Sequence, residues 1–239
     1  MALLLATARC ITLLVVAGTS ASAMGGVSGF YGHGNLSEMR GWINLLPIDT
    51  PDLEAFESDI ASPSNQSIAA LARLVPGDIY VRGIHSTVLL PGWQAALRAV
   101  FEREVLPRLA TRVVRGVMLG DELCCGNSTC VTSSLYPLSA EVRRLVGPEP
   151  IIWTNECWST VAGGKIKGIG PLKAMVPPDL NIFGIDNYYG YLAGQDPRIE
   201  VNQTRGFTET HIYPKMHSKQ RVMMVPLHVP RCRVVWVSA

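Results

Sequence analysis

The chain has 239 residues, of which 48% are hydrophobic and 17% are charged, and its formal net charge is +2. A near-neutral chain without a basic cluster lacks the electrostatic footprint that nucleic-acid backbones and anionic lipid surfaces require, so neither is expected as a partner. Neutral partners such as carbohydrates fit this composition better. The length is ordinary for one α/β barrel of about 200 to 250 residues and predicts a single domain.

Residues 1–23 have the pattern of a secretory signal peptide. Arg9 precedes an apolar stretch over residues 10–17, and residues 21–23, Ala-Ser-Ala, fit a small-residue cleavage site. The alternative is a membrane anchor, but the stretch is shorter than the roughly 20 residues that a spanning helix needs. We therefore expect a secreted protein with no membrane span after cleavage and one domain over residues 24–239. Loss of Arg9 leaves 20 basic and 19 acidic residues, so the formal net charge of this domain is 20 minus 19, or +1.

Cysteine usage agrees with an oxidising compartment. The mature cysteines are Cys124, Cys125, Cys130, Cys157 and Cys232. Because adjacent cysteines bond each other only with strain, we expect one of Cys124 and Cys125 to bond Cys130 and the other to reach Cys157. Zinc is disfavoured because the paired C-x-x-C spacing is missing, so no metal is expected.

Asparagine sequons agree with the same route, since their modification would place these segments at the surface. The candidate glycosylation sites are Asn35, Asn65, Asn127 and Asn202.

The first half of the chain predicts a short strand within residues 26–34 and then a helix from Thr50 toward Ile60. Thr50 is expected to cap this helix, with Pro51 in its first turn. Residues 67–75 are expected to form a second helix that ends at a Pro-Gly pair, and residues 78–84 a strand.

The second half alternates helices and strands. Apolar residues recur at helical spacing from Trp93, and Pro107 should end or kink that helix before a strand over residues 113–119. Ser139 is expected to cap the next helix, which closes at Gly147. Further apolar runs predict strands over residues 151–154, 181–189 and 221–225.

Near-continuous apolar strands that alternate with helices favour a parallel sheet covered on both faces. Either a barrel or a doubly wound sheet satisfies this pattern. The chain has no Gly-x-Gly-x-x-Gly turn after a strand and no Walker sequence, so nucleotide folds are disfavoured and no cofactor is expected. The preferred fold is a (β/α)8 TIM barrel.

Four acids follow the predicted strands: Asp121, Glu122, Glu156 and Asp186. In a parallel barrel the carboxyl ends of the strands carry the functional groups, so these acids should gather at one rim. Glycoside hydrolysis needs one carboxylic acid to protonate the leaving oxygen and a second carboxylate to attack or to activate water. Asp121 and Glu122 cannot form that pair by adjacency alone, because successive strand residues point to opposite faces. The alternative for each acid is a structural cap or an ion pair.

Four other residues are candidate ligands for a sugar: Tyr188, Trp153, Asn155 and His85. Tyrosine and tryptophan offer flat apolar faces with a polar handle, although such side chains also fill cores. His85 could bond a ligand hydroxyl at the rim, or it could be structural. No serine–histidine esterase pattern is present.

The motif over residues 116–123, Gly-Val-Met-Leu-Gly-Asp-Glu-Leu, precedes Asn155-Glu156 and then residues 185–188, Ile-Asp-Asn-Tyr. Together these motifs resemble little-characterised eukaryotic members of the TIM-barrel glycoside hydrolase superfamily, over roughly residues 78–226. The resemblance implies an eight-stranded barrel that hydrolyses or binds glycans, with Glu122 matching an acid at the end of the fourth strand.

Two departures limit what the resemblance implies. Retaining members carry a second glutamate at strand seven, whereas the strand over residues 221–226 ends without an acid. Residues 231–239 leave no room for a final helix and strand, so the barrel is expected to be incomplete at its C-terminus. The sequence therefore predicts a secreted hydrolase-like barrel with Glu122 as general acid/base and Asp186 or Glu156 as its partner. The alternatives are a non-catalytic glycan-binding barrel and a truncated, inactive product.

Overall fold

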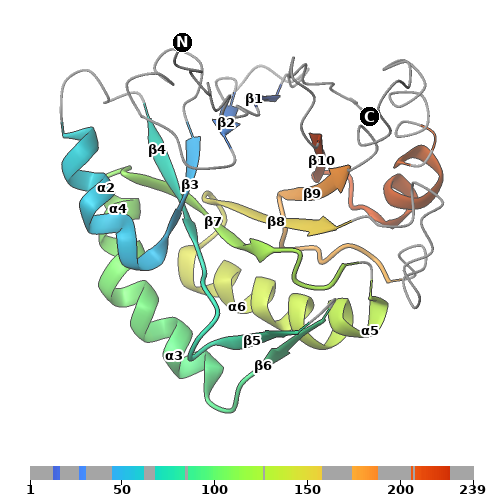
Figure 1. The fold of residues 1–239 in the computed structure, drawn as a ribbon, viewed down its shortest axis with the longest axis horizontal. Helices are drawn as coiled ribbons and strands as arrows, with labels where there is room; N and C mark the ends of the chain where they lie inside the picture. Colours follow the sequence, from blue (N-terminus) through green and yellow to red (C-terminus); the bar gives the residue numbers. More distant parts are fainter. Residues whose placement is uncertain are drawn as a thin grey trace, which may run out of the picture.

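The computed structural model is mixed α/β and is built around one large, mainly parallel sheet (Figure 1). It describes residues 13–16, 27–30, 45–61, 68–83, 86–125, 127–157, 174–187, 206 and 208–226. The strands of the large sheet are β1 Leu13–Val16, β2 Val27–Phe30, β3 Leu45–Asp49, β4 Ala69–Arg73, β7 Val114–Asp121, β8 Ile151–Cys157, β9 Ile182–Asn187 and β10 Arg221–Pro226.

Strand order in this sheet follows chain order, as β1-β2-β3-β4-β7-β8-β9-β10. From β2 onward each strand runs parallel to the next. A doubly wound sheet reverses its strand order at a switch point, and no reversal occurs in the part of the chain that the structure describes. The predicted parallel sheet is confirmed, whereas the predicted barrel is not shown. Closure is not observed, because β1 and β10 do not pair with each other within the described strands.

The first strand lies inside the segment that the sequence predicts to be cleaved. In the uncleaved chain β1 pairs antiparallel with β2. Cleavage after residue 23 stays a prediction, and so does the domain over residues 24–239. No helix among the described residues is both long enough and apolar enough to cross a membrane.

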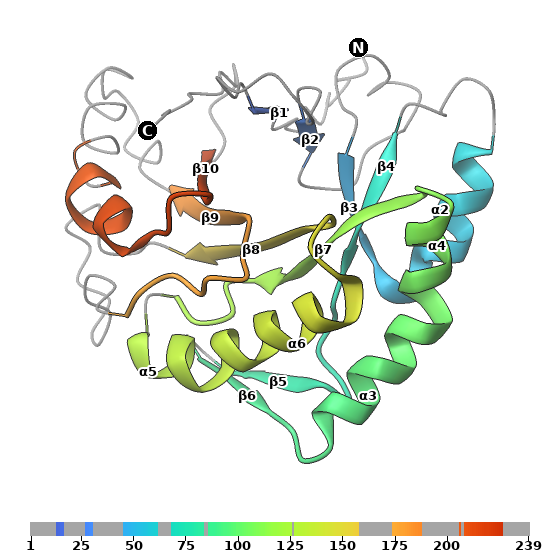
Figure 2. The same ribbon diagram turned by 180° about the vertical axis from the view of Figure 1, so that it is seen from behind.

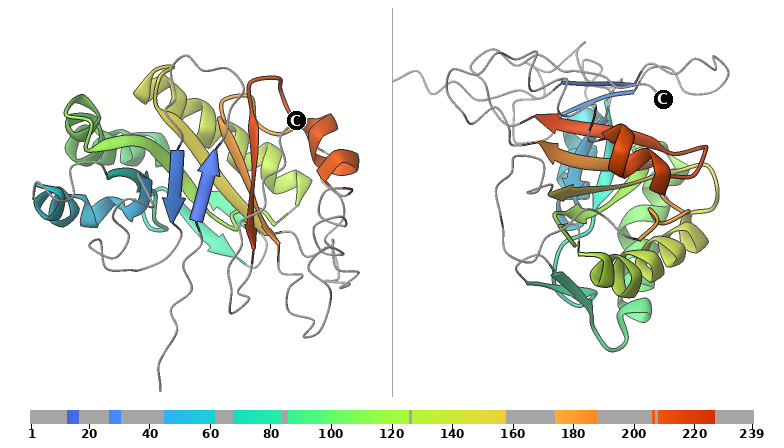
Figure 3. Two further views of the ribbon diagram at one scale, coloured as in Figure 1. Left: turned by 90° about the horizontal axis from the view of Figure 1, so that it is seen from above. Right: turned by 90° about the vertical axis from the view of Figure 1, so that its right-hand side faces the viewer.

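Helical segments connect the strands and gather mainly on one side of the sheet (Figures 1 and 2). The α-helices are α2 Leu53–Ile60, α3 Trp93–Val100, α4 Leu106–Ala110, α5 Ser128–Cys130 and α6 Tyr136–Val146. Short 3-10 turns are η1 Thr50–Asp52 and η6 Tyr213–Lys215, and π-helical turns are η2 Phe101–Val105, η3 Val131–Leu135 and η5 Thr208–Ile212. The side view in Figure 3 shows α3 and α6 beneath the sheet.

The sheet buries apolar side chains on both of its faces. On the helix face, strand residues such as Val117, Leu119 and Ile152 pack with residues of the helices. The second face carries its own apolar cluster: Leu45, Ala69, Leu71, Met118, Ile151, Trp153 and Ile182. Burial on both faces explains why the strands read as near-continuous apolar runs.

Residues 67–75 were expected to be helical, and that prediction is wrong. Ala69–Arg73 forms β4, paired with β3 on one side and β7 on the other. Alanine favours helices by propensity, but four of the five residues of β4 are buried between neighbours, and tertiary burial outweighs so weak a preference.

The predictions that Thr50 and Ser139 each cap a helix are both wrong. Thr50 lies in the first turn of η1, and the N-cap residue is Asp49, without a side-chain cap bond. Ser139 lies inside α6, where its hydroxyl donates to the Tyr136 carbonyl. The helical segment begins earlier, at Ser128, because Asn127 Oδ1 accepts the N–H groups of Thr129 and Cys130 at 3.1 and 3.2 Å.

Pro107 does not end its helix. The π-turn η2 precedes it, and Pro107 then occupies the first turn of α4 in a helical stretch that continues without a break from α3. The chain bearing Ile212 to Lys215 repeats this arrangement before β10, since η5 is followed by η6 with a proline in its first turn.

Replacing Asn127 should test the cap directly. Asn127→Ala removes the acceptor of both N–H groups and should lower the free energy of unfolding by about 1 kcal/mol. Asn127→Asp keeps the acceptor and should retain the stability, and both variants lose the sequon equally. Urea denaturation of the two variants measures the difference, and equal losses would show that the cap is not the cause.

Arg143 fixes the end of the sheet opposite to the strand ends that carry the acids. Its guanidinium donates to the carbonyls of Gly147, Pro148, Pro150 and Asp179 and to Asn181 Oδ1. Asn181 Oδ1 also accepts the N–H of Ile152 at 2.8 Å. These bonds hold the starts of β8 and β9 in register, which in turn sets where both strands end.

Candidate functional site at the carboxyl ends of the strands

The ends of β7, β8 and β9 lie next to one another in parallel register. Asp121 pairs with Asn155, and Cys157 pairs with Asp186. These strands therefore bring three of the four candidate acids, Asp121, Glu156 and Asp186, to one edge of the sheet. Glu122 follows directly after β7.

Asp121 lies on the second face of the sheet. Its register partner Asn155 stands two residues beyond Trp153 of the second-face cluster, and residues two apart share a face. Asn155 Nδ2 donates to Asp121 Oδ1 at 2.8 Å. The Asn155 side chain is buried, so it fixes the direction of the Asp121 carboxylate at the strand end.

Glu122 leaves the strand in another direction. Its φ of 50° lies in the left-handed region, which costs a residue other than glycine roughly 1–2 kcal/mol. Its N–H donates to the Asn155 carbonyl at 2.7 Å, and its Oε2 accepts Arg82 Nη2 at 2.8 Å. Arg82 belongs to the hairpin of β5 Tyr80–Gly83 and β6 Ser86–Leu89, which lies outside the large sheet. The two adjacent acids thus diverge.

Glu156 points to the helix face and is only 1% exposed. It alternates with Asn155 along β8, so it occupies the face opposite to the one that carries Asp121. Its Oε2 accepts the N–H groups of Cys124 and Cys125, each at 2.8 Å, and its Oε1 accepts the Thr154 hydroxyl at 3.1 Å.

Burial raises the pKa of Glu156 to about 7, although the three hydrogen bonds favour its ionised form and oppose this rise. The negative charge of Asp121 adds to the increase. A carboxyl group without access to water cannot meet a substrate in this conformation. Its contacts instead define it as the support of the loop after β7.

Sequence reasoning missed an ion pair at the ends of β3 and β4. The Arg73 guanidinium binds both oxygens of the Asp49 carboxylate, and Arg73 Nη2 lies 3.0 Å from Asp49 Oδ2. Each residue ends a short apolar strand, and a charged residue at that position is the sequence signal from which the ion pair could have been predicted. The charges of both residues and of Asp121 act on the buried hydroxyl of Tyr80, so all of them lie near it.

Tyr80 itself is a buried donor beneath these groups. Its hydroxyl donates to the carbonyls of Leu74 and Leu119 at 3.1 and 3.4 Å. Burial is the main cause that raises the pKa of Tyr80 far above its ordinary value, so it stays protonated. It joins the ends of β4 and β7 from the hairpin.

The remaining sequence candidates are placed differently. Trp153 is 3% exposed and packs in the second-face cluster, which matches the core alternative rather than a sugar platform. Asp186 is described for its backbone alone. Its side chain lies outside the described residues, as do His85, Tyr188 and the sequons at Asn35, Asn65 and Asn202.

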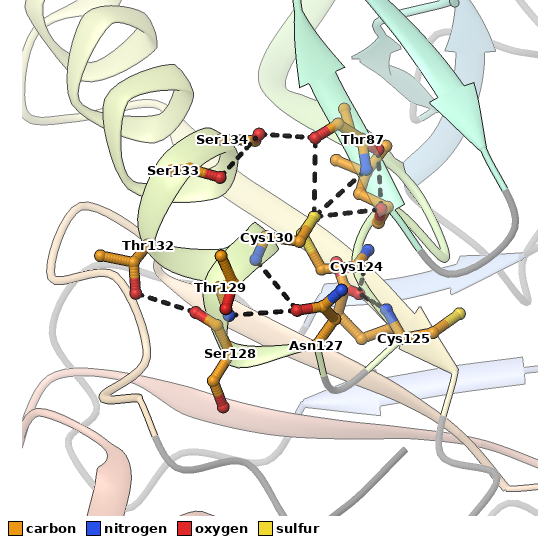
Figure 4. The surroundings of a disulfide bond; sticks show 12 residues. Thr87, Cys124, Cys125, Asn127, Ser128, Thr129, Cys130, Thr132, Ser133 and Ser134 are labelled. Carbon is orange, nitrogen blue, oxygen red and sulfur yellow. Dashed lines mark hydrogen bonds between the residues drawn. A yellow bond between two sulfur atoms is a disulfide. The ribbon is translucent and has the colours of Figure 1, made fainter. Parts of the chain in front are cut away.

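Cys124 and Cys130 form a disulfide, which confirms the first half of the predicted pairing (Figure 4). Cys125 is disulfide-bonded as well, and its partner lies outside the described side chains. The predicted partner, Cys157, stays a prediction. Thr87 of β6 anchors the bonded loop, because its N–H donates to Cys130 Sγ at 3.2 Å and its hydroxyl donates to the Leu123 carbonyl at 2.7 Å.

Gly184 of β9 makes room for the Asn155 side chain. A Cβ at this position would stand 2.6 Å from Asn155 Oδ1 and 2.6 Å from Trp153 Nε1. Gly184→Ala should therefore displace Asn155 from Asp121 and lower the free energy of unfolding by about 2 kcal/mol, as overpacking of a core does. Urea denaturation measures the loss. Gly206→Ala is the matched control, because nothing lies within 4 Å of its Cβ position.

Within the described residues, no group of three His, Cys, Asp or Glu side chains could hold a metal ion. The described side chains of the site include carboxylates, one amide and two arginines.

No family model matches this sequence, and no curated protein matches it. Among solved structures, a β-D-glucuronidase of Dictyoglomus thermophilum is similar at 14% identity and a TM-score of 0.44, over 78% of this chain and 30% of that one. A GH18 chitinase of Pseudoalteromonas aurantia is 11% identical with a TM-score of 0.40, over 78% of this chain and 74% of that one.

A proposed sporulation-specific glycosylase of Bacillus subtilis is 13% identical with a TM-score of 0.42, over 86% of this chain and 66% of that one. The chain thus spans less than a third of the glucuronidase, at 30% of its length.

Proposed function

We propose that this protein is a secreted, glycoside hydrolase-like protein that acts on glycans at the carboxyl edge of its parallel sheet. The observation that carries the proposal is the parallel register of β7, β8 and β9, which brings Asp121 and the backbone of Asp186 to one edge. Glycosidic hydrolysis needs two carboxyl groups around one bond, and neighbouring parallel strand ends can supply them.

Each acid has a distinct role in this proposal. Glu122 exchanges the proton with the glycosidic oxygen, and its bond to Arg82 keeps it at the strand end until the substrate replaces that partner. Asp186 supplies the second carboxylate. Asp121 is oriented by Asn155 and binds a sugar hydroxyl. Glu156 is removed from the reacting pair, because it is 1% exposed and already accepts three hydrogen bonds.

A panel of aryl and natural glycosides tests the catalytic proposal. The secreted wild-type chain should hydrolyse at least one of them, and Glu122→Gln or Asp186→Asn should lower the rate by about 10²- to 10⁴-fold, the usual contribution of a proton-transferring group. Glu141→Gln is the matched control, since Glu141 lies on α6 and pairs with Arg144. Both site variants keeping the wild-type rate would contradict the assignment.

A second candidate function is glycan binding without hydrolysis. The observation that favours it is that Glu122 and Asp121 already bond Arg82 and Asn155, and that β10 ends at Pro226 rather than at an acid. Binding on a glycan array with no turnover of the bound glycans would select this candidate.

Secretion is tested separately from chemistry. Expression in a eukaryotic secretory host should release the chain into the medium with Met24 as its first residue. Retention in the membrane fraction with an intact N-terminus would instead support the anchor.

A further inference from the structure

The loop over residues 122–125 is held from three directions. From β8, the Glu156 carboxylate accepts two of its N–H groups, those of Cys124 and Cys125, at 2.8 Å. From the hairpin, Arg82 binds Glu122, and Thr87 donates to the Leu123 carbonyl. The disulfide to Cys130 ties its far end to the following helix. Of these contacts, the one from β8 depends on a buried group that can gain or lose a proton, the Glu156 carboxyl group.

The loop covers the carboxyl group to which it binds. Glu156 is 1% exposed, and Cys124 and Cys125, which bond its Oε2, are 0% and 2% exposed. When these residues lift away from Glu156, its carboxyl group meets water. A carboxyl group that is buried in the closed loop and hydrated in the opened loop prefers to be neutral in the first and ionised in the second.

The geometry also indicates where the proton sits. Oε2 accepts two N–H groups, which occupy both of its lone pairs, whereas Oε1 accepts the Thr154 hydroxyl. In the neutral form the proton therefore lies on Oε1, while both loop bonds to Oε2 remain. On ionisation this proton leaves to solvent.

The charge of Asp121 favours the same direction. Asp121 on β7 is negative and disfavours a second negative charge. Arg82 on β5 bonds Glu122. The side chains that α6 buries, the described side chains of β9 through Ile185 and the disulfide-bonded Cys124 and Cys125 carry no charge.

We propose that Glu156 is a positioning residue that latches the loop over residues 122–125, which is closed when Glu156 is neutral and opens more readily when Glu156 is ionised. The pKa of this group, which burial raises to about 7, puts the transition near neutral pH. Because the loop carries Glu122 and follows Asp121, its opening separates the acids of the site. Under the proposed function, on which this last step rests, hydrolysis is confined to the acidic side of neutrality.

Amide hydrogen exchange of the full secreted chain, resolved by residue, tests the latch without any sugar. Protection factors of the Cys124 and Cys125 amides, corrected for intrinsic exchange, should fall by about tenfold to about a hundredfold between roughly pH 5 and pH 8, since each pKa unit between closed and opened loops is a factor of about ten. In Glu156→Gln, whose amide mimics the neutral acid, protection should be high and independent of pH.

Two further variants keep the test decisive. Thr154→Val removes a hydrogen bond that favours the ionised form, so the fall should move to higher pH, and this outcome is readable even when Glu156→Gln does not fold. Glu141→Gln changes a carboxyl on α6 that bonds Arg144 and should leave the profile unchanged. A flat wild-type profile, or a fall that persists in Glu156→Gln, overturns the latch.

The latch and the proposed function fail separately. A pH-dependent loop in a chain that cleaves no glycoside would leave the latch standing and remove the enzyme. Hydrolysis with pH-independent protection of both amides would do the reverse.

Discussion

Gly116→Ala is expected to lower the free energy of unfolding by about 3 kcal/mol, a large part of the roughly 5–15 kcal/mol that keeps a domain folded. A Cβ at Gly116 would stand 2.3 Å from the Ile151 carbonyl oxygen, 2.8 Å from Ile151 Cβ and 2.8 Å from Leu71 Cδ2. The first of these atoms belongs to the backbone of β8, which pairs with β7 at this position. It cannot rotate away, so the two strands must separate.

Urea denaturation of Gly116→Ala beside Gly206→Ala measures this loss. Gly206 has nothing within 4 Å of its Cβ position, so the control reports the entropy effect of replacing glycine alone. The first variant should unfold at a much lower urea concentration and the control at nearly the wild-type value. Equal midpoints would mean that β7 and β8 are not packed as closely as this register requires.

The same strand pair shows why the parallel sheet was predictable from the sequence. Val117 and Leu119 are buried on the helix face and Met118 on the second face, so β7 is apolar at consecutive positions. Such a run, bounded by a short loop and an acid, is typical of a strand covered on both sides. Repeating it at β8, β9 and β10 predicts a parallel sheet, but the apolar pattern leaves its strand order open between a barrel and a doubly wound sheet.

Local rules failed where tertiary contacts decide. Ala69–Arg73 is helical by propensity but is held as a strand between β3 and β7. The strand around Tyr80 was expected and found, but it pairs with β6 in a hairpin outside the large sheet, where the Tyr80 hydroxyl binds the carbonyls of Leu74 and Leu119. Neither outcome is encoded within the segment itself.

The edge that carries the acids was predictable, but the face of each acid was not. The pairing of β7 with β8 shifts between Met118 and Asp121, and this irregularity places Asp121 on the second face beside Asn155. Counting alternate residues from Met118 would have put Asp121 on the other face. Glu122 turns away only because its backbone is left-handed. Glu156 looked like a partner acid by spacing, yet strand alternation buries it beneath the loop.

Burial of Glu156 should make the whole fold less stable as the pH rises from about 4.5 to about 7. The group has a pKa of about 7 in the folded chain and an ordinary value of 4.5, which stands for the unfolded chain. Below the lower value both states are protonated, and the stabilising contribution is complete. Between the two values the unfolded chain loses its proton first, so the folded state binds more protons and is destabilised by rising pH.

Above about pH 7 both states are ionised, and the folded chain retains a buried charge. Since a pKa unit corresponds to about 1.4 kcal/mol, this charge should lower the free energy of unfolding by about 3 kcal/mol relative to pH 4.5. In Glu156→Gln this contribution is absent at every pH. The variant should therefore match the wild type near pH 4.5 and exceed it near pH 8.

Urea denaturation of both chains at several pH values measures the difference, and subtraction removes the titration of all other groups. Glu141→Gln is the matched control, because the bond to Arg144 lowers the pKa of Glu141. The contribution of Glu141 to stability therefore changes with pH in the opposite direction to that of Glu156. Parallel curves for the wild type and Glu156→Gln would show that Glu156 is hydrated in the folded chain. That result would also remove the latch, because the closed loop could then not distinguish a neutral carboxyl from an ionised one.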